Sequence, residues 1–370
     1  MFKPASVEIV ARRLHLCSHI KDFTLNTIKD RDTVQKIEVR PKLPEGIFGV
    51  SHMAADDGSV KPSYQKFLSG NFYDTICFNY TQMGCPQDEI KKIKTQFSDF
   101  TFLLFCGRGQ FGSVWLVEDF WGQIVALKLI HKKSVSQIET EKEGLAIYRD
   151  RISNFEHLVE IYEIGETEDF FYYTMEAAYS VSNKYYVPVT LARLLEHFFF
   201  YSSDCANISL DILNGLKELH SNDLAHRDIK PENIILADNK IKIADISLIS
   251  NKSQKSYVGT ELFIPQDMND IPLEQFGASC DLFAAGKVLY SLLANEEDIT
   301  KFPQISKEML QDTLAKKLNL IINKACDPAY QNRFASAYEF IQALNKIDKS
   351  CAGHCQVDMG KTSSGKLDLG

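Results

Sequence analysis

Eight consecutive residues constrain this chain more than any others: His226-Arg227-Asp228-Ile229-Lys230-Pro231-Glu232-Asn233. Asp245 follows twelve positions later, after the alternating run Ile241-Lys242-Ile243-Ala244. Two carboxylates, an ammonium group and an amide are therefore predicted on two short loops that flank a small hairpin. Phosphoryl transfer with a divalent metal uses this set of groups. One acid accepts the proton of the attacking hydroxyl, the lysine neutralises the moving group, and the amide and second acid hold the metal.

The order of the predicted elements indicates an α+β fold. Apolar and alternating runs predict strands at 102–105, 113–117, 124–130, 158–164 and 170–176, with a charged helix at 135–149. Helical spacing of apolar residues dominates afterwards, at 190–200, 206–221, 279–294, 307–324 and 334–347. A strand-rich part followed by a helix-rich part predicts a crevice between the two.

The run from His226 to Asn233 resembles the catalytic loop of the eukaryotic-type protein kinases. A second motif, Gly107-Arg108-Gly109-Gln110-Phe111-Gly112-Ser113-Val114, fits the pattern GxGxxGxV of that family. It is predicted between two strands, as in the phosphate-covering loop of kinases, whereas a dinucleotide-binding fold needs a strand that leads into a helix. The two motifs occur in the order that the family requires.

Details of the match look like serine/threonine kinases. Lys230, two places after Asp228, is typical of that class, and Thr260 stands where the class has a threonine that touches both residues. Segments 257–265 and 286–290 look most like bacterial members of the family. The resemblance therefore implies a protein substrate with a serine or threonine hydroxyl.

The resemblance also implies a two-lobed protein kinase fold over residues 98–348. Residues 98–176 would form a small lobe rich in strands with one main helix, and residues 179–348 a larger helical lobe. Residues 1–97 would be an N-terminal extension of unknown role. Residues 349–370, rich in Gly, Ser and Lys, are predicted to be a disordered tail.

By the same resemblance, the cleft would bind ATP with Mg²⁺, or with Mn²⁺ in its place. Lys128 would contact the α- and β-phosphates and needs an acidic partner, for which Glu141 is preferred and Glu143 is the competitor. Adenine would bond to the Glu176 carbonyl and the Ala178 amide. The other residues implied in nucleotide binding are Gly107, Gly109, Gly112, Val114, Ala126 and Ile235.

The roles within the catalytic loop also follow from the resemblance. Asp228 would orient and deprotonate the substrate hydroxyl, and Lys230 would neutralise the γ-phosphoryl group. Asn233 and Asp245 would bind the metal. Asp281 resembles the buried helix aspartate that holds the backbone of this loop.

Two motifs depart from the family pattern. Asp245-Ile246-Ser247 replaces Asp-Phe-Gly, which keeps the metal-binding acid but removes the backbone freedom of glycine. We therefore expect restricted flipping of this loop and retained Mg²⁺ binding. Pro265-Gln266-Asp267 replaces Ala-Pro-Glu and keeps a shorter acid that could pair with Arg333.

Composition argues against several other classes of protein. A net charge of −8 without a long basic run gives no reason to expect nucleic-acid binding. No stretch is predicted to span a membrane, and no secretory signal is visible. Nine cysteines without paired spacing indicate free thiols in a reducing compartment, so we expect a cytoplasmic protein. The sequence does not predict the oligomeric state.

Two alternatives to an active kinase stay open. The altered motif ending in Ser247 would suit a pseudokinase or scaffold that binds nucleotide and partners without efficient catalysis. A small-molecule phosphotransferase of related fold ranks last, because such enzymes usually lack this glycine loop together with Lys230 and Pro231. If the kinase is active, Arg227 could pair with a phosphate on the activation segment, and we expect autophosphorylation at Ser253 or Ser256.

Overall fold

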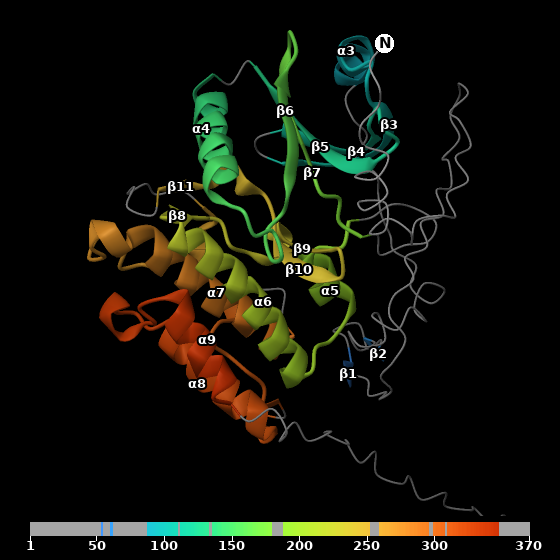
Figure 1. The fold of residues 1–370 in the computed structure, drawn as a ribbon. Coiled ribbons are helices and arrows are strands. Elements are labelled where there is room, and N and C mark those ends of the chain that lie inside the picture. The colour runs from blue at the N-terminus through green and yellow to red at the C-terminus, as the bar shows by residue number, and fades with distance from the viewer. Residues whose placement is uncertain are drawn as a thin grey trace, which may run out of the picture.

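The computed structural model describes residues 53–54, 60–61, 87–109, 112–132, 135–179, 188–251, 259–295, 299–307 and 309–347. Over these residues the chain forms a small lobe of strands and two helices, next to a larger lobe of helices (Figure 1). Most of the predicted extension and the whole predicted tail lie outside the described residues. So do Ser253 and Ser256, where autophosphorylation is expected.

The small lobe is built on a five-stranded antiparallel sheet with the order β3-β4-β5-β7-β6. Its strands are β3 (Thr101–Gly109), β4 (Gly112–Glu118), β5 (Ile124–His131), β6 (Ile161–Glu166) and β7 (Phe170–Met175). Branched and aromatic residues dominate β5 and β7, as a pleated and half-buried surface favours. Apart from this sheet, β1 (Met53–Ala54) pairs with β2 (Val60–Lys61).

Alternation along the strands gives this sheet two different faces. Lys128 and Ala126 of β5 share a face with their cross-strand partners, Val114 of β4 and Met175 of β7. This face turns toward helix α4 (Val135–Arg151) and the larger lobe. The sheet thus presents the predicted nucleotide-binding residues of both strands on one side.

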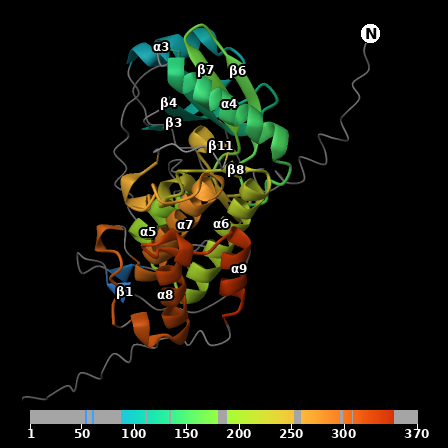
Figure 2. The ribbon, with the colours of Figure 1, turned by 90° about the vertical axis from the view of Figure 1, so that its left-hand side faces the viewer.

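Helix α3 (Gln87–Gln96) covers the other face, across the sheet from α4 (Figures 1 and 2). Ile93 and Phe97 are 2% and 6% exposed. They pack on buried strand residues, namely Trp115, Val117, Val125, Leu127, Leu129 and Phe170. Asp169 in the β6–β7 turn accepts hydrogen bonds from Lys92 (2.7 Å) and from Gln96 (2.7 Å). Part of the predicted extension therefore belongs to the core of the small lobe.

The larger lobe is built around the buried helix α7, against which α6 and α8 pack, while α9 packs on α6. The helices are α5 (Leu191–His197), α6 (Ser202–Ser221), α7 (Phe276–Ala294), α8 (Thr313–Ala325) and α9 (Ala337–Asn345). Its short strands are β8 (Leu224–Ala225), β9 (Ile234–Ala237), β10 (Lys240–Ile243) and β11 (Ser250–Asn251). Single turns of 3₁₀ helix are η1 (Pro231–Asn233), η2 (Ile246–Leu248), η3 (Glu261–Phe263), η4 (Leu273–Gln275), η5 (Ile299–Lys301), η6 (Met309–Gln311) and η7 (Tyr330–Asn332).

The hairpin of β9 and β10 brings the two halves of the predicted metal site together. Its turn residues Asp238 and Asn239 both have positive φ, 47° and 57°, as a two-residue hairpin turn of this hand needs. The antiparallel register ends at the pair Ile234–Ile243, and the amide of Ala244 donates to the carbonyl of Asn233 (2.8 Å). Asn233 and the residue after Ala244, Asp245, therefore leave the same end of the hairpin.

The predicted α+β order is confirmed, and several boundaries differ, two of them for a clear physical reason. The strand predicted at 158–164 begins only at Ile161, because Leu158 instead bridges to Ile243 of the larger lobe. The helix predicted at 307–324 begins at Thr313, where the side chain of Asp312 accepts hydrogen bonds from the first free amides.

One helix bears on the expectation that no stretch spans a membrane. Within the described residues, the helical stretch Leu273–Ala294 is long and apolar enough to cross a membrane by length and composition alone. However, 78% of the 18-residue apolar segment within this stretch is buried inside the protein. It includes α7, whose apolar residues are accounted for by the core that they form with α6 and α8.

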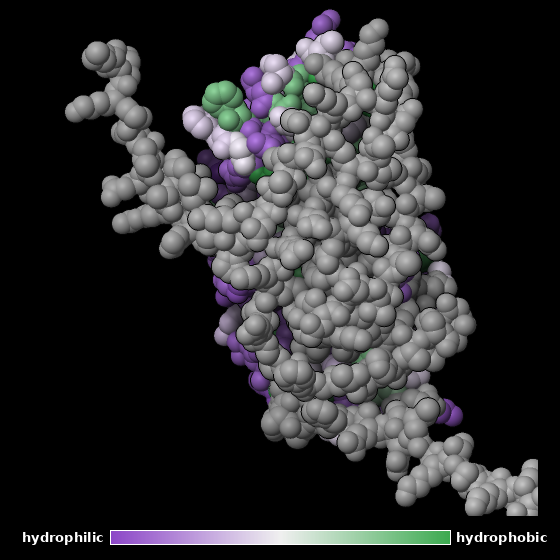
Figure 3. Space-filling view, turned by 90° about the vertical axis from the view of Figure 1, so that its right-hand side faces the viewer, coloured by the Kyte–Doolittle hydropathy of each residue, from purple (hydrophilic) through white to green (hydrophobic). Residues whose placement is uncertain are grey.

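The described side chains that Figure 3 shows at the surface are of mixed hydropathy. In the space-filling view, hydrophilic side chains follow the edges of the visible face, and hydrophobic ones appear among them at the small-lobe end (Figure 3). Among the described residues, the most exposed aromatic side chains are Phe120 (77%) and Trp121 (85%) in the β4–β5 turn, whose rings meet edge to face. Scattered apolar residues of this kind are normal on a protein surface and require no partner.

Candidate active site

Lys128 on β5 carries a buried ammonium group. Its ammonium group lies 3.0 Å from Oε1 of Glu141 on α4, and the Lys128 and Glu141 side chains are 7% and 3% exposed. The hydroxyl of Tyr173 donates to the same carboxylate (3.2 Å). Glu143, the competing partner, is exposed on α4. Burial opposes the charge of Lys128, but Tyr173 and the carboxylates of Asp245 and Glu141 together outweigh it and raise its pKa above the ordinary value.

Asp245 links the larger lobe to this lysine. Its backbone adopts the left-handed conformation (φ 54°, ψ 70°) just before η2. Its Oδ1 lies 2.9 Å from the Lys128 ammonium, and the hydroxyl of Ser247 donates to the same oxygen. Loss of hydration opposes ionisation of Asp245, yet the charge of Lys128 and these hydrogen bonds hold its pKa well below the usual range. The carboxylate is therefore ionised at neutral pH.

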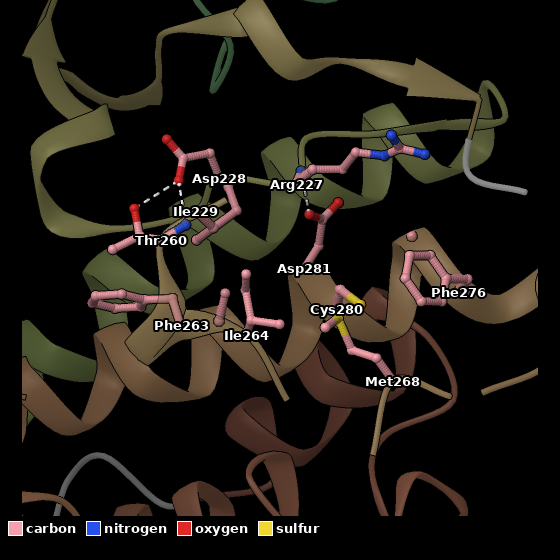
Figure 4. Close-up of a pocket in the computed structure, with 12 residues that line it drawn as sticks. Arg227, Asp228, Ile229, Thr260, Phe263, Ile264, Met268, Phe276, Cys280 and Asp281 are labelled. Carbon is pink, nitrogen blue, oxygen red and sulfur yellow. Dashed lines mark hydrogen bonds between the residues drawn. The ribbon is translucent and has the colours of Figure 1, made fainter. Parts of the chain in front are cut away.

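The carboxylate of Asp228 is held from four directions. Its Oδ1 accepts from the amide (3.1 Å) and the hydroxyl (2.9 Å) of Thr260. Its Oδ2 accepts from Asn233 Nδ2 (2.9 Å) and lies 2.8 Å from the Lys230 ammonium, which also donates to the Thr260 hydroxyl (2.9 Å). Figure 4 shows Asp228 and Thr260 facing each other across this contact. The expected contact of Thr260 with both residues is present.

Asp281 fixes the backbone on which Asp228 stands. Its carboxylate accepts from the amides of His226 (2.8 Å) and Arg227 (2.7 Å), and from the ring of His220 (2.9 Å). Arg227 has a positive φ of 70°, an uncommon conformation for a residue with a side chain. The buried aspartate on α7 thus holds a backbone bend next to the acid (Figure 4), as the sequence led us to expect.

A small cavity lies on the far side of this loop, between the catalytic loop, η3 and the start of α7 (Figure 4). Asp228, Thr260, Ile264, Met268 and Cys280 are among the residues that line it. Its volume of about 20 Å³ leaves room for about one water molecule. It is therefore no ligand pocket as it stands.

The glycine-rich motif spans the end of β3 and the start of β4. Gly107 and Gly109 lie in β3, Gly112 and Val114 in β4, and the two residues between the strands are outside the described part. A Cβ atom at Gly112 would collide with the carbonyl oxygen of Leu129 in β5, so that glycine is required by the sheet itself. A Cβ at Gly107 would meet nothing within 4 Å. The space beside Gly107 is therefore open to a ligand such as a phosphate.

The predicted hinge follows β7. Glu176 turns its side chain toward β10, where its Oε2 lies 2.8 Å from the ammonium of Lys242, and the two side chains are 13% and 7% exposed. Ala178 is half-buried next to it, and Ile235, buried in β9, stands opposite Lys242 in the hairpin. Burial raises the pKa of Glu176 despite this lysine. Nothing in the sequence had marked Lys242 as part of the hinge.

The shortened acid of the Pro-Gln-Asp motif reaches its partner. Arg333 is 5% exposed, and its guanidinium donates to Oδ1 of Asp267 and, through Nε, to the carbonyl of Asp327 (2.8 Å). The other oxygen of Asp267 accepts from the amide of Tyr330 (2.7 Å). The expected pairing of Asp267 with Arg333 is therefore present.

The donor set fits a magnesium–nucleotide complex. Both hydrogen bonds that the side chain of Asn233 makes run through Nδ2, so its Oδ1 stays available beside Asp245. The described residues include no group of three or more His, Cys, Asp or Glu that could hold a metal. Mg²⁺ is usually held by one or two carboxylates together with substrate phosphates, for which this sparse arrangement is suited.

Comparison with known families agrees with this geometry. A family model described as a protein kinase domain matches residues 100–351. The chain therefore belongs to the protein kinase family, and its two lobes are those of that fold.

Relatives with assigned names are kinases from several eukaryotes. The chain is 31% identical over 233 residues to calcium-dependent protein kinase 4 of Plasmodium falciparum. This match covers 58% of the chain and 42% of the Plasmodium protein. It is 29% identical over 224 residues to the probable serine/threonine-protein kinase fhkC of Dictyostelium discoideum, covering 58% and 36%. The chain spans less than half the length of these relatives. They lend no support to the expected likeness to bacterial kinases.

Proposed function

We propose that this chain is a serine/threonine protein kinase that transfers the γ-phosphoryl group of MgATP to a protein hydroxyl. The observation that carries the proposal is the closed network around Asp228, made by Lys230, Asn233 and Thr260. These groups include an acid that can take a proton and a cation beside it, and phosphoryl transfer depends mainly on such positioning and charge stabilisation.

Each residue would contribute a separate effect. Asp228, oriented by Thr260, would hold the substrate hydroxyl and accept its proton, while Lys230 would offset negative charge next to it. Lys128, kept in place by Glu141, would bind nucleotide phosphates. Bound Mg²⁺, held by the oxygens of Asn233 and Asp245, would neutralise charge on the phosphates.

The class of substrate rests on the same network. Lys230 and Thr260 form the pair that resembles serine/threonine kinases, and named relatives are described as such kinases. The likeness of segments 257–265 and 286–290 to bacterial members stays a prediction. We also propose a cytoplasmic location, supported by the free thiols of Cys106, Cys205, Cys280 and Cys326 within the described residues.

Replacement of Asp228 by Asn tests the proposal. We expect D228N to lose nearly all transfer to a generic basic protein, because the proton acceptor is gone, while ATP binding measured by thermal shift persists. Asp150→Asn, at an exposed position of α4, is the matched control and should keep full activity. Full activity of D228N would refute the assignment. ATP binding by the native chain without any transfer would favour the pseudokinase that Ser247 suggests.

A further inference from the structure

We propose that Ser247 is a positioning residue, which keeps the carboxylate of Asp245 oriented for metal binding when nucleotide occupies the cleft. The proposal rests on the kinase function proposed above. It gives a role to the residue by which this chain departs from the Asp-Phe-Gly pattern.

Ser247 makes two hydrogen bonds, one to each lobe: to Lys128 of β5 and to Asp245 before η2. It is 4% exposed, and its hydroxyl donates to Oδ1 of Asp245 and accepts from the ammonium of Lys128. A glycine at this position has no side-chain donor. The serine therefore adds a contact to Asp245 that the family pattern does not provide.

The two oxygens of Asp245 are left in different states. Oδ1 is held by Ser247 and by Lys128 (2.9 Å), whereas no hydrogen bond to Oδ2 occurs among the described residues. The Asp245 side chain as a whole is 41% exposed. The hydroxyl of Ser247 thus fixes the carboxylate plane while leaving one oxygen for a cation.

Nucleotide binding makes this contact more important. An ammonium group has three donors, and those of Lys128 face Glu141, Asp245 and Ser247. A phosphate that binds Lys128 must take one of these places. Ser247 still donates to Oδ1 after Lys128 has turned away, so the orientation of Asp245 survives the exchange.

The backbone that carries Ser247 is held against α4. A Cβ atom at Gly144 of α4 would lie only 2.8 Å from the carbonyl oxygen of Ile249, directly after η2. The helix and this turn are therefore in close contact. Because the turn is braced in this way, Ser247 cannot easily move away from Asp245.

The test separates nucleotide binding from its dependence on metal. ATP binding is measured calorimetrically in EDTA, and by thermal shift at rising MgCl₂, for the native chain, S247A, S247G and S247T. Ser209→Ala is the matched control, because Ser209 is an equally buried serine whose hydroxyl has no partner within the described structure. S247T retains a hydroxyl and serves as the conservative variant.

We expect S247A and S247G to need on the order of tenfold more Mg²⁺ for the half-maximal shift, as loss of one hydrogen bond to a charged group predicts. Their ATP affinity in EDTA should match that of the native chain, S209A should not change either measurement, and S247T should restore the native Mg²⁺ dependence. If S247T does not fold, S247A and S209A decide the question by themselves.

Two results would overturn the role of Ser247 without contradicting the proposed kinase function. One is an unchanged Mg²⁺ midpoint in S247A and S247G. The other is an equal loss of ATP affinity with and without metal, which would indicate only a structural role. A native chain that binds no ATP at any Mg²⁺ concentration would overturn the proposed function and this inference with it.

Discussion

Gly144 sets how close α4 can come to the metal-binding turn, and with it the position of Glu141. The carbonyl oxygen of Ile249 occupies the place that a side chain at 144 would need. Glu141 stands one turn earlier on the same helix and meets Lys128 at 3.0 Å. A substitution at Gly144 should therefore change the position of Glu141 relative to Lys128.

We expect Gly144→Ala to lower kcat/KM by about 10- to 100-fold, since a displacement of about 1 Å at a reacting group can have that effect. Alanine raises helix propensity by about 1 kcal/mol relative to glycine, but its Cβ would meet backbone atoms of the turn, so thermal unfolding should show none of the stabilisation that propensity alone predicts. Ala146→Gly, at an exposed position of the same helix, is the converse control. It should cost about 1 kcal/mol of stability and leave activity unchanged, and equal activity of both variants would contradict the argument.

The sequence predicted which residues form the candidate site better than it predicted which of their side chains touch. Asp228, Lys230 and Thr260 were placed correctly against one another, because motif spacing determines them. The choice of Glu141 over Glu143 required the direction of α4, which periodicity alone left open. The contact between Ser247 and Asp245 depends on side-chain torsions within η2, for which the sequence carries no signal.

A buried ion pair joins the predicted hinge to the larger lobe. Glu176, directly after β7, lies 2.8 Å from the ammonium of Lys242 in β10. Replacing Lys242 by Met would leave Glu176 buried without its partner. We expect a loss of about 3–5 kcal/mol in the free energy of unfolding, the usual result of breaking a buried pair from one side. Lys240→Met, on the same strand but in an exposed pair with Glu156, should cost no more than about 1 kcal/mol.

The defect of K242M should depend on pH in a defined direction. Burial already raises the pKa of Glu176 above its usual 4.5, and removal of the lysine should raise it further. An acid with a raised pKa in the folded state contributes stability below its usual value and loses it as pH rises through the folded pKa. Denaturant unfolding should therefore show a larger defect at about pH 8 than at about pH 5. A defect independent of pH would show that Glu176 is not the buried charge responsible.

Elements were predictable where one periodicity dominated. The alternating run of β10 and the turn after β9 predicted the hairpin that joins Asn233 to Asp245. Helix α3 was missed as part of the domain, because its residues precede the stretch that resembles a kinase. The packing of Ile93 and Phe97 on the sheet, together with the hydrogen bonds from Lys92 and Gln96 to Asp169, identifies it as a component of the small lobe.

For the whole molecule, α3 divides the N-terminal extension into two parts with different predicted effects. Residues 87–97 cover the face of the sheet that turns away from the cleft, whereas most of residues 1–86 lie outside the described structure. Residues 87–97 should therefore brace the small lobe without reaching the active site. A segment of the extension that inhibits by entering the active site would therefore have to lie within residues 1–86.

Three chains separate these roles: the full chain, one that begins at Gln87 and one that begins at Ser98. The chain from Ser98 loses both Ile93 and Phe97, and we expect it to unfold at least about 3–5 kcal/mol more easily, the cost of deleting one buried aromatic side chain. The chain from Gln87 should retain the stability of the small lobe.

Ile93→Ala in the full chain, compared with Thr95→Ala at an exposed position of α3, should reproduce about 2–5 kcal/mol of the loss. Higher kinase activity from Gln87 than from the full chain would place an inhibitory segment before α3, whereas equal stability of the two truncated chains would contradict a bracing role.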